Sequence, residues 1–284
     1  MRRVIGVLRS AGLRFSQDAC GFFAQAIAFN AMFAIFPLLL LALATMGFVF
    51  GDRGELIVTG FIAQLAPSIQ ALLFENVQHV IQFRGITGAI ALIALLWSGR
   101  NLFQTLAFSL DRALGIPKGR HPLGEILIAS VTLPAFAIIL LVAAAVPIAI
   151  SFIVRFGGFK DTVFITQAAS YGAGLLLVFV VTMWLYTFLP NRRFSLRFGI
   201  PGAIVTTILW ELSQIAFAIY STHVDFRHVY GALATVAVLL LWFYYMGTIF
   251  LFGAQVSAQW LAASETQAVP AQAASATDTS GSRA

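Results

Sequence analysis

The chain has 284 residues, of which 60% are apolar and only 10% are charged, and its formal net charge is +6. Average soluble domains carry about 25% charged residues, so the composition argues against a soluble domain. Several apolar runs reach the length of about 20 residues that crosses a bilayer as a helix. They do not alternate as the strands of a membrane barrel do. The sequence therefore predicts an all-α integral membrane protein.

In chain order, residues 1–21 form a basic cytoplasmic segment that could lie on the membrane as a short amphipathic helix. A membrane domain is expected over residues 22–261. Apolar residues recur at helical spacing in residues 51–85, which predicts an amphipathic helical hairpin at the interface. The polar tail, residues 262–284, is expected to be disordered. The six predicted spans are 22–50, 86–110, 126–154, 168–189, 200–220 and 232–261.

Six spans place both termini on one side of the membrane. Of the 17 Lys and Arg residues, eleven lie on that side, five lie on the other, and Arg100 lies inside a span. The positive-inside rule then predicts that both termini are cytoplasmic. The first apolar run is too long for a signal peptide and has no clear cleavage pattern, so we interpret it as a retained span. Because topology explains the basic residues, we expect no nucleic-acid partner.

Two charged residues lie inside predicted spans, Arg100 in the second and Glu211 in the fifth. At 1.5 Å per residue from the cytoplasmic ends, they lie about 15 and 16 Å deep, and Asn30 lies about 12 Å deep. Gln104 shares a helix face with Arg100, and Gln214 shares one with Glu211. Charges in spans are rare and normally face the bundle interior. We hypothesise that these five residues form one connected polar layer.

The polar layer has two interpretations. It could carry a transported group, or it could be a buried ion pair that only fixes the register of the helices. Arg100 could also reach the cytoplasmic interface, which would leave Glu211 protonated or paired elsewhere.

Six basic residues lie in the two predicted cytoplasmic turns, and we call them the basic rim. Setting the topology explains them. They could in addition bind lipid headgroup phosphates, at about 1 kcal/mol per basic residue near an anionic surface. The basic rim consists of Arg112, Lys118, Arg120, Arg192, Arg193 and Arg197.

Residues for catalysis or metal binding are sparse. His223, Asp225 and His228 have a spacing that resembles a metal-ligand set, but a polar external loop explains them as well. The single cysteine, Cys20, excludes a disulfide within the chain. No phosphate-binding glycine loop and no nucleophile with a matching base stands out. We therefore expect no enzyme activity, no metal and no cofactor.

Five stretches together resemble the YihY / virulence factor BrkB family of bacterial inner-membrane proteins. They are Ala26–Pro37, Leu96–Leu114, Thr187–Arg193, Pro201–Tyr220 and Val229–Gln255. The resemblance implies six spans and an inner-membrane location, but no known reaction. The family's older label as a ribonuclease is regarded as a misassignment, and some relatives are linked to serum resistance or to export of lipid or lipopolysaccharide precursors. Gln255 stands where relatives often carry Glu, which puts any argument that needs a carboxylate there in doubt.

Two functions remain open. The first is a transporter or flippase-like protein that moves a lipid or amphiphilic anion past the polar layer, with membrane lipids as partners. The second is a non-transporting scaffold for envelope assembly, as a homo-oligomer or with envelope-assembly partners. Replacing Glu211 by Gln and Arg100 by Met would discriminate between them.

Overall fold

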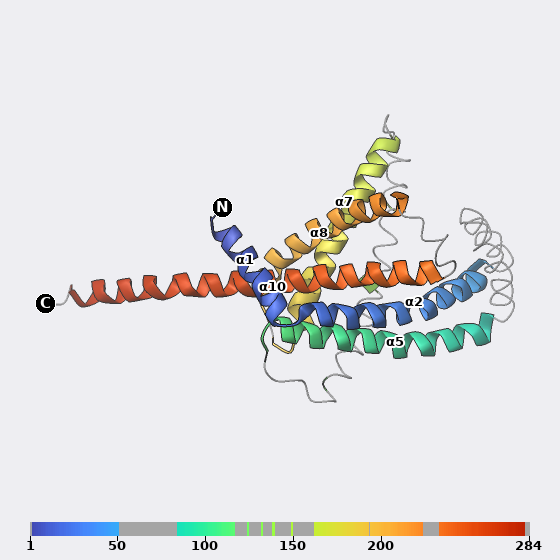
Figure 1. Cartoon of the computed structure of the whole chain (residues 1–284), viewed down its shortest axis with the longest axis horizontal. Helices are drawn as coiled ribbons and strands as arrows, with labels where there is room; N and C mark the ends of the chain where they lie inside the picture. Colours follow the sequence, from blue (N-terminus) through green and yellow to red (C-terminus); the bar gives the residue numbers. More distant parts are fainter. Residues whose placement is uncertain are drawn as a thin grey trace. The chain divides into compact units, whose positions relative to one another are not determined.

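The structure, a computed structural model, describes residues 2–50, 84–116, 162–192, 194–223 and 233–281, and five isolated positions between residues 124 and 149. In these ranges all regular elements are helices, which confirms the all-α prediction. The helices in Figure 1 are α1 (Arg2–Gln17), α2 (Cys20–Phe50), α5 (Arg84–Ala113), α7 (Thr162–Phe188), α8 (Leu196–His223) and α10 (Leu233–Gly281).

Five described helices are long and apolar enough to cross a membrane, and they coincide with five of the six predicted spans. Their outward side chains include Phe22 and Ile93, each 69% exposed, as a helix surface in contact with lipid requires. The predicted span at 126–154 lies outside the described residues apart from isolated positions, so the count of six stays a prediction. The predicted hairpin also lies outside them, apart from Arg84 and Gly85, which begin α5. The candidate spans are Cys20–Leu41, Gly85–Ala113, Tyr171–Phe188, Leu196–Phe217 and Val236–Ser264.

The chain divides into two compact units. The first comprises Met1–Ala28 and Gln104–Ala284, and the second is Phe29–Phe103. The first unit therefore contains α1, α7, α8 and α10, together with the beginning of α2 and the end of α5. The second contains the rest of α2 and α5, including Pro37, which is buried inside α2.

In the first unit, α8 and α10 meet at two glycines. A Cβ on Gly202 would lie 2.3 Å from the carbonyl oxygen of Gly253. A Cβ on Gly253 would lie 2.0 Å from the Thr206 hydroxyl oxygen. Small residues let membrane helices approach at backbone distance, and here only glycine fits. The Gly202 amide also donates a hydrogen bond to the Ser257 hydroxyl at 3.1 Å.

A buried tyrosine joins three helices beside this crossing. The Tyr186 hydroxyl, on α7, donates to the Phe250 carbonyl of α10 at 2.5 Å. Its oxygen lies 2.7 Å from the Thr206 hydroxyl of α8, so Thr206 is the donor of the second bond. Unpaired polar groups are expensive in an apolar interior, so these bonds fix how α7, α8 and α10 pack.

The N-terminal helix packs against α10 of the first unit, and α10 itself runs on toward the C-terminus. The short helix expected near the N-terminus is present as α1. Its residues Val7 and Ala11 pack against Val256 of α10. Its residues Val4 and Ile5 remain exposed. The helix α10 continues to Gly281, through most of the segment where the sequence predicts a disordered tail. The alanines of that segment have the highest helix propensity of any residue, which favours this continuation.

Candidate functional site

Glu211, the carboxylate inside the fifth predicted span, has a hydrogen-bond partner that the sequence analysis did not name. The Tyr171 hydroxyl of α7 donates to the Glu211 carboxylate of α8. Tyr171 lies 17 residues before the end of α7 at Phe188, and Glu211 lies 15 residues after the start of α8 at Leu196. The two residues lie at similar depth when they are counted from these observed helix ends, whereas the predicted span ends at residues 189 and 200 place them 18 and 11 residues deep.

The other residues of the predicted polar layer divide between the two units. Arg100 and Asn30 belong to the second unit, whereas Glu211, Gln104 and Gln214 belong to the first. The connected layer, including the Arg100–Glu211 pair, therefore stays a prediction.

Three residues of the basic rim are described, and all three are exposed: Arg112, Arg192 and Arg197. The buried Asp111 carboxylate accepts a hydrogen bond from the backbone N–H of Asn191 at 2.7 Å. This bond joins the end of α5 to the α7–α8 turn, so the two predicted basic turns meet at one end of the first unit.

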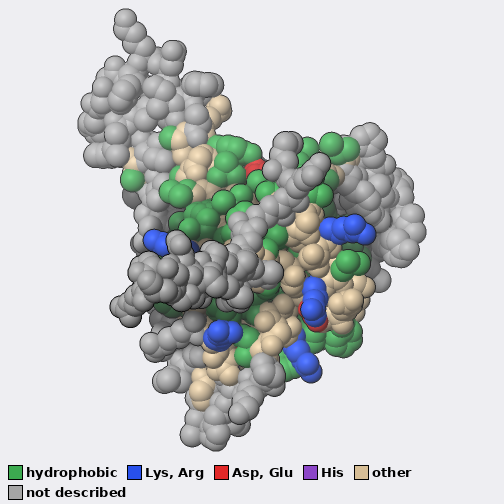
Figure 2. All heavy atoms as spheres, turned by 90° about the vertical axis from the view of Figure 1, so that its left-hand side faces the viewer, with side chains coloured by type: hydrophobic (Ala, Val, Ile, Leu, Met, Phe, Trp, Pro, Cys, Tyr) green, Lys and Arg blue, Asp and Glu red, His purple; other side chains and the backbone are tan. Residues whose placement is uncertain are grey.

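A cation–π contact also stabilises the α7–α8 turn, because the Arg192 guanidinium lies 5.7 Å from the centre of the Phe194 ring. Figure 2 shows Lys and Arg side chains in blue among polar and apolar ones. The remaining rim residues, Lys118, Arg120 and Arg193, lie outside the described residues.

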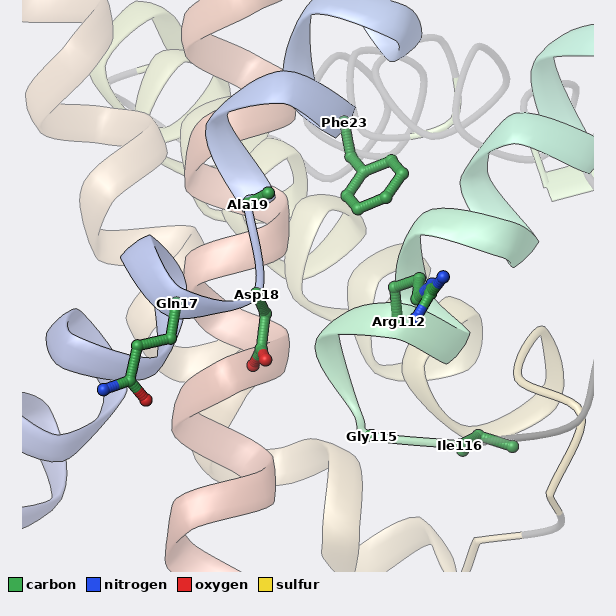
Figure 3. Close-up of a pocket in the computed structure, with 7 residues that line it drawn as sticks. All are labelled: Gln17, Asp18, Ala19, Phe23, Arg112, Gly115 and Ile116. Atoms are coloured by element: carbon green, nitrogen blue, oxygen red, sulfur yellow. The ribbon is translucent and has the colours of Figure 1, made fainter.

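A cavity of about 470 Å³ lies at this end, and we call it the hinge pocket. Its volume falls within the range of about 300–1,000 Å³ that is typical of small-molecule sites. One wall is the junction between α1 and α2, and the other is the end of α5 (Figure 3). The lining residues are Gln17, Asp18, Ala19, Phe23, Arg112, Gly115 and Ile116.

The first wall is a tight junction of two residues, Asp18 and Ala19. Ala19 has a φ of 52°, a left-handed conformation that costs a residue with a side chain about 1–2 kcal/mol. The surrounding contacts hold it there. The Asp18 carboxylate accepts a hydrogen bond from the Gln255 side chain at 2.7 Å, and Gln255 is only 1% exposed. The junction is thereby attached to α10.

The second wall is a Schellman motif that ends α5. Gly115 takes a φ of 67°, and the Ile116 amide donates to the Asp111 carbonyl at 2.8 Å. The Gly115 amide donates to the Arg112 carbonyl at 3.1 Å. The rings of Phe23 and Phe108 meet edge to face, with centroids 5.7 Å apart, and hold the start of α2 against α5.

The hinge pocket carries one acidic and one basic side chain. Figure 3 shows Asp18 and Arg112 on opposite walls of the cavity. Sequence reasoning identified Arg112 as part of the basic rim but missed Asp18. The available signal was that Asp18 is the one acidic residue among the first 50. Among the described residues, no group of three His, Cys, Asp or Glu side chains could hold a metal ion.

The predicted external ligand set can be followed only in part. His223 ends α8, whereas Asp225 and His228 lie outside the described residues.

Comparison with known proteins identifies relatives along most of the chain. The UPF0761 membrane protein of Coxiella burnetii is 28% identical over 262 residues, which cover 86% of this chain and 89% of that protein. A Bacillus subtilis protein named putative ribonuclease-like protein YfkH is 29% identical over 240 residues, covering 82% of this chain and 86% of its own length.

A longer relative, the UPF0761 membrane protein of Rhodospirillum rubrum, is 27% identical over 242 residues, and the match spans only 54% of its length. No solved structure matches the chain. The family model described as Virulence factor BrkB matches residues 11–277. The chain therefore belongs to the virulence factor BrkB family, whose relatives here include UPF0761 membrane proteins.

Proposed function

We propose that this multi-pass helical membrane protein moves or flips a lipid or an amphiphilic anion across the bacterial inner membrane, using six spans with both termini in the cytoplasm. The observation that carries the proposal is the hydrogen-bonded Glu211–Tyr171 pair within the candidate spans of α7 and α8. An acidic residue at the centre of a membrane helix costs about 2.5–3.5 kcal/mol on insertion scales. A polar cargo that passes this depth is one reason to retain it.

The surroundings of Glu211 favour this interpretation. Its neighbours Ile208, Leu212 and Ile215 on α8 are 55–57% exposed, so the carboxylate lies beside an outward apolar surface. Glu211 itself is only partly buried. A purely structural polar pair would be expected deep in the core, where Tyr186 lies. The Glu211–Tyr171 pair is instead accessible to a molecule that approaches from the lipid phase.

The hinge pocket and the basic rim support the same proposal from the other end of the helices. In the proposed topology the α1–α2 junction, the end of α5 and the α7–α8 turn all face the cytoplasm. Basic residues there attract anionic lipid headgroups of the cytoplasmic leaflet. Arg112 belongs to both the rim and the pocket, so a headgroup attracted by the rim would have a cavity to enter.

We do not carry the ribonuclease-like name of the Bacillus subtilis protein over to this chain. Metal-free cleavage of RNA needs an acid and a base that both reach the scissile phosphate. Asp18 is hydrogen-bonded to an amide, Gln255, which cannot exchange protons with it. The proposed role of the pocket is therefore binding, without a chemical step.

A scaffold for envelope assembly is the alternative, and the length of α10 favours it. Its 49 residues extend about 70 Å at 1.5 Å per residue, whereas a bilayer core is about 30 Å thick. A helix of this length could present its end to a partner or to a second copy of the chain.

Reconstitution of the purified protein into vesicles tests the proposal. A fluorescent phospholipid or lipid-like anion is placed in both leaflets, and a membrane-impermeant reductant reports what reaches the outer leaflet. Transport predicts faster exchange than in protein-free vesicles. If exchange is equally slow with and without protein for all amphiphiles offered, the scaffold alternative replaces the proposal.

A further inference from the structure

We infer that the hinge pocket selects a group that carries both a phosphate and a primary ammonium, as phosphoethanolamine does. This inference deepens the proposed function, because it rests on the amphiphilic cargo proposed above and names the class of head group. Binding at the pocket can nevertheless be measured without transport.

The charges of the pocket carry the argument. Its lining includes one carboxylate, Asp18, and one guanidinium, Arg112, on opposite walls (Figure 3). A group with only negative charge would be attracted by Arg112 and repelled by Asp18. A zwitterion with its two charges separated can satisfy both walls at once. The pocket therefore favours a zwitterionic ligand over a simple anion.

Asp18 is prepared to accept a second donor. The Gln255 amide holds the carboxylate at 2.7 Å but brings no charge, so the negative charge is not cancelled. A carboxylate has about four acceptor positions, and the Gln255 bond uses one of them. A primary ammonium supplies N–H donors and forms charge-assisted bonds with such an acceptor.

The ammonium must be unmethylated for this recognition. A trimethylammonium group has no N–H donor and is normally bound by a cage of several aromatic rings. The pocket lining contains one aromatic ring, that of Phe23. Choline head groups would therefore lose the bond to Asp18 without an aromatic replacement.

Arg112 suits the phosphate. Its planar guanidinium presents several donors in a fork that matches phosphate oxygens. The Schellman motif fixes the backbone of this turn through the bond from the Gly115 amide to the Arg112 carbonyl. Phe23 and Ile116 give the cavity an apolar portion, which the carbon chain next to a lipid phosphate would contact.

The test measures binding of short-chain lipids to the purified full-length protein in detergent, by calorimetry. Dihexanoyl-phosphatidylethanolamine is compared with the phosphatidylglycerol and phosphatidylcholine of the same chain length. We expect the ethanolamine lipid to bind about tenfold more tightly than either. Equal binding of the three lipids, or tighter binding of phosphatidylglycerol, would overturn the inference on the unmutated protein alone.

Variants then assign the preference to the two walls. Asp18→Asn keeps an acceptor for Gln255 but removes the negative charge. The affinity for the ethanolamine lipid should therefore fall to the affinity for phosphatidylglycerol. Arg112→Gln should lower the binding affinity for all three lipids by about the same factor. Arg197→Gln, an exposed rim residue outside the pocket lining, is the matched control and should change nothing. A preference that survives Asp18→Asn contradicts the inference.

Soluble phosphoethanolamine distinguishes the two sources of the same chemistry. If it binds as tightly as the lipid, the pocket takes a soluble compound. If the lipid binds more tightly, the pocket takes a membrane head group. Selective binding without lipid exchange in vesicles would overturn the transport proposal but support the inference on the pocket. Lipid exchange without selective binding would support transport but overturn the inference on the pocket.

Discussion

The side-chain amide of Gln255 donates a hydrogen bond to the Asp18 carboxylate at 2.7 Å, across 237 positions of the sequence. The bond attaches the α1–α2 junction to α10 and holds one wall of the hinge pocket. In this chain the neutral amide is a donor to Asp18, which a carboxylate at neutral pH could not be.

Replacing Gln255 by Glu should therefore destabilise the protein at neutral pH. Two carboxylates would meet at a buried position, at a cost of about 1–3 kcal/mol in the free energy of unfolding. Both carboxylates carry a negative charge at neutral pH, so the deficit should shrink as acidification protonates one of them. Thermal unfolding in detergent at several pH values measures it, with Gln259→Glu, one turn further on, as control. A pH-independent deficit would contradict the explanation.

The glycine crossing of α8 and α10 predicts that Gly253→Ala is severely destabilising. The new methyl would lie 2.0 Å from the Thr206 hydroxyl oxygen and 2.5 Å from the Tyr186 hydroxyl oxygen. Overpacking of this kind costs about 1–3 kcal/mol or more. Gly174→Ala on α7 is the matched control, because a Cβ there meets nothing within 4 Å. That variant should be neutral or stabilised by up to about 1 kcal/mol in the same unfolding assay.

Tyr186→Phe tests the hydroxyl that joins α7, α8 and α10. The ring can keep its place against Phe250, but the Thr206 hydroxyl and the Phe250 carbonyl lose a partner. We expect a loss of about 1–2 kcal/mol in the free energy of unfolding. The control Tyr245→Phe, at a tyrosine that is 49% exposed, should change the free energy of unfolding by close to zero. A loss at Tyr186 no larger than this control would mean that the bonds contribute nothing to stability.

The proposed topology predicts which side of the membrane the α7–α8 turn faces. Cys20 is the single cysteine, so a Cys20→Ala background allows one new cysteine to be placed at exposed Ser195. In intact spheroplasts, a membrane-impermeant thiol reagent should not label Ser195→Cys, and it should label it after permeabilisation. Labelling of intact cells would place the turn outside and reverse the proposed orientation.

The helices could be predicted from the sequence because their apolar runs are long. The predicted span 86–110 lies within α5 (Arg84–Ala113), and the predicted span 200–220 lies within α8 (Leu196–His223). The hydrophobic length required by the bilayer decides these elements without tertiary information. The end of α10 was not predicted as a helix, although its alanines have a high helix propensity.

The site was harder to predict, because its residues meet only in the folded chain. Arg112 was identified from the clustering of basic residues in loops. Asp18 was missed because its partner, Gln255, is 237 positions away. Tyr171 was missed because it lies 40 positions from Glu211, on another helix. Counted from the predicted span ends at residues 189 and 200, Tyr171 lies 18 residues and Glu211 11 residues from the cytoplasmic side, so the depth count did not point to Tyr171.

The most direct test of the central proposal is the rate of lipid exchange in reconstituted vesicles with Glu211→Gln. Thr207→Val is the matched control, because its hydroxyl, on the same helix, bonds only to the Ala203 carbonyl of that helix. With both variants folded and equally reconstituted, transport through this site predicts that Glu211→Gln slows exchange about tenfold or more, a barrier increase of about 1.4 kcal/mol. Arg100→Met should slow it similarly if the predicted polar layer forms. Exchange by Glu211→Gln at the rate of Thr207→Val would contradict the account and leave Glu211 a structural residue.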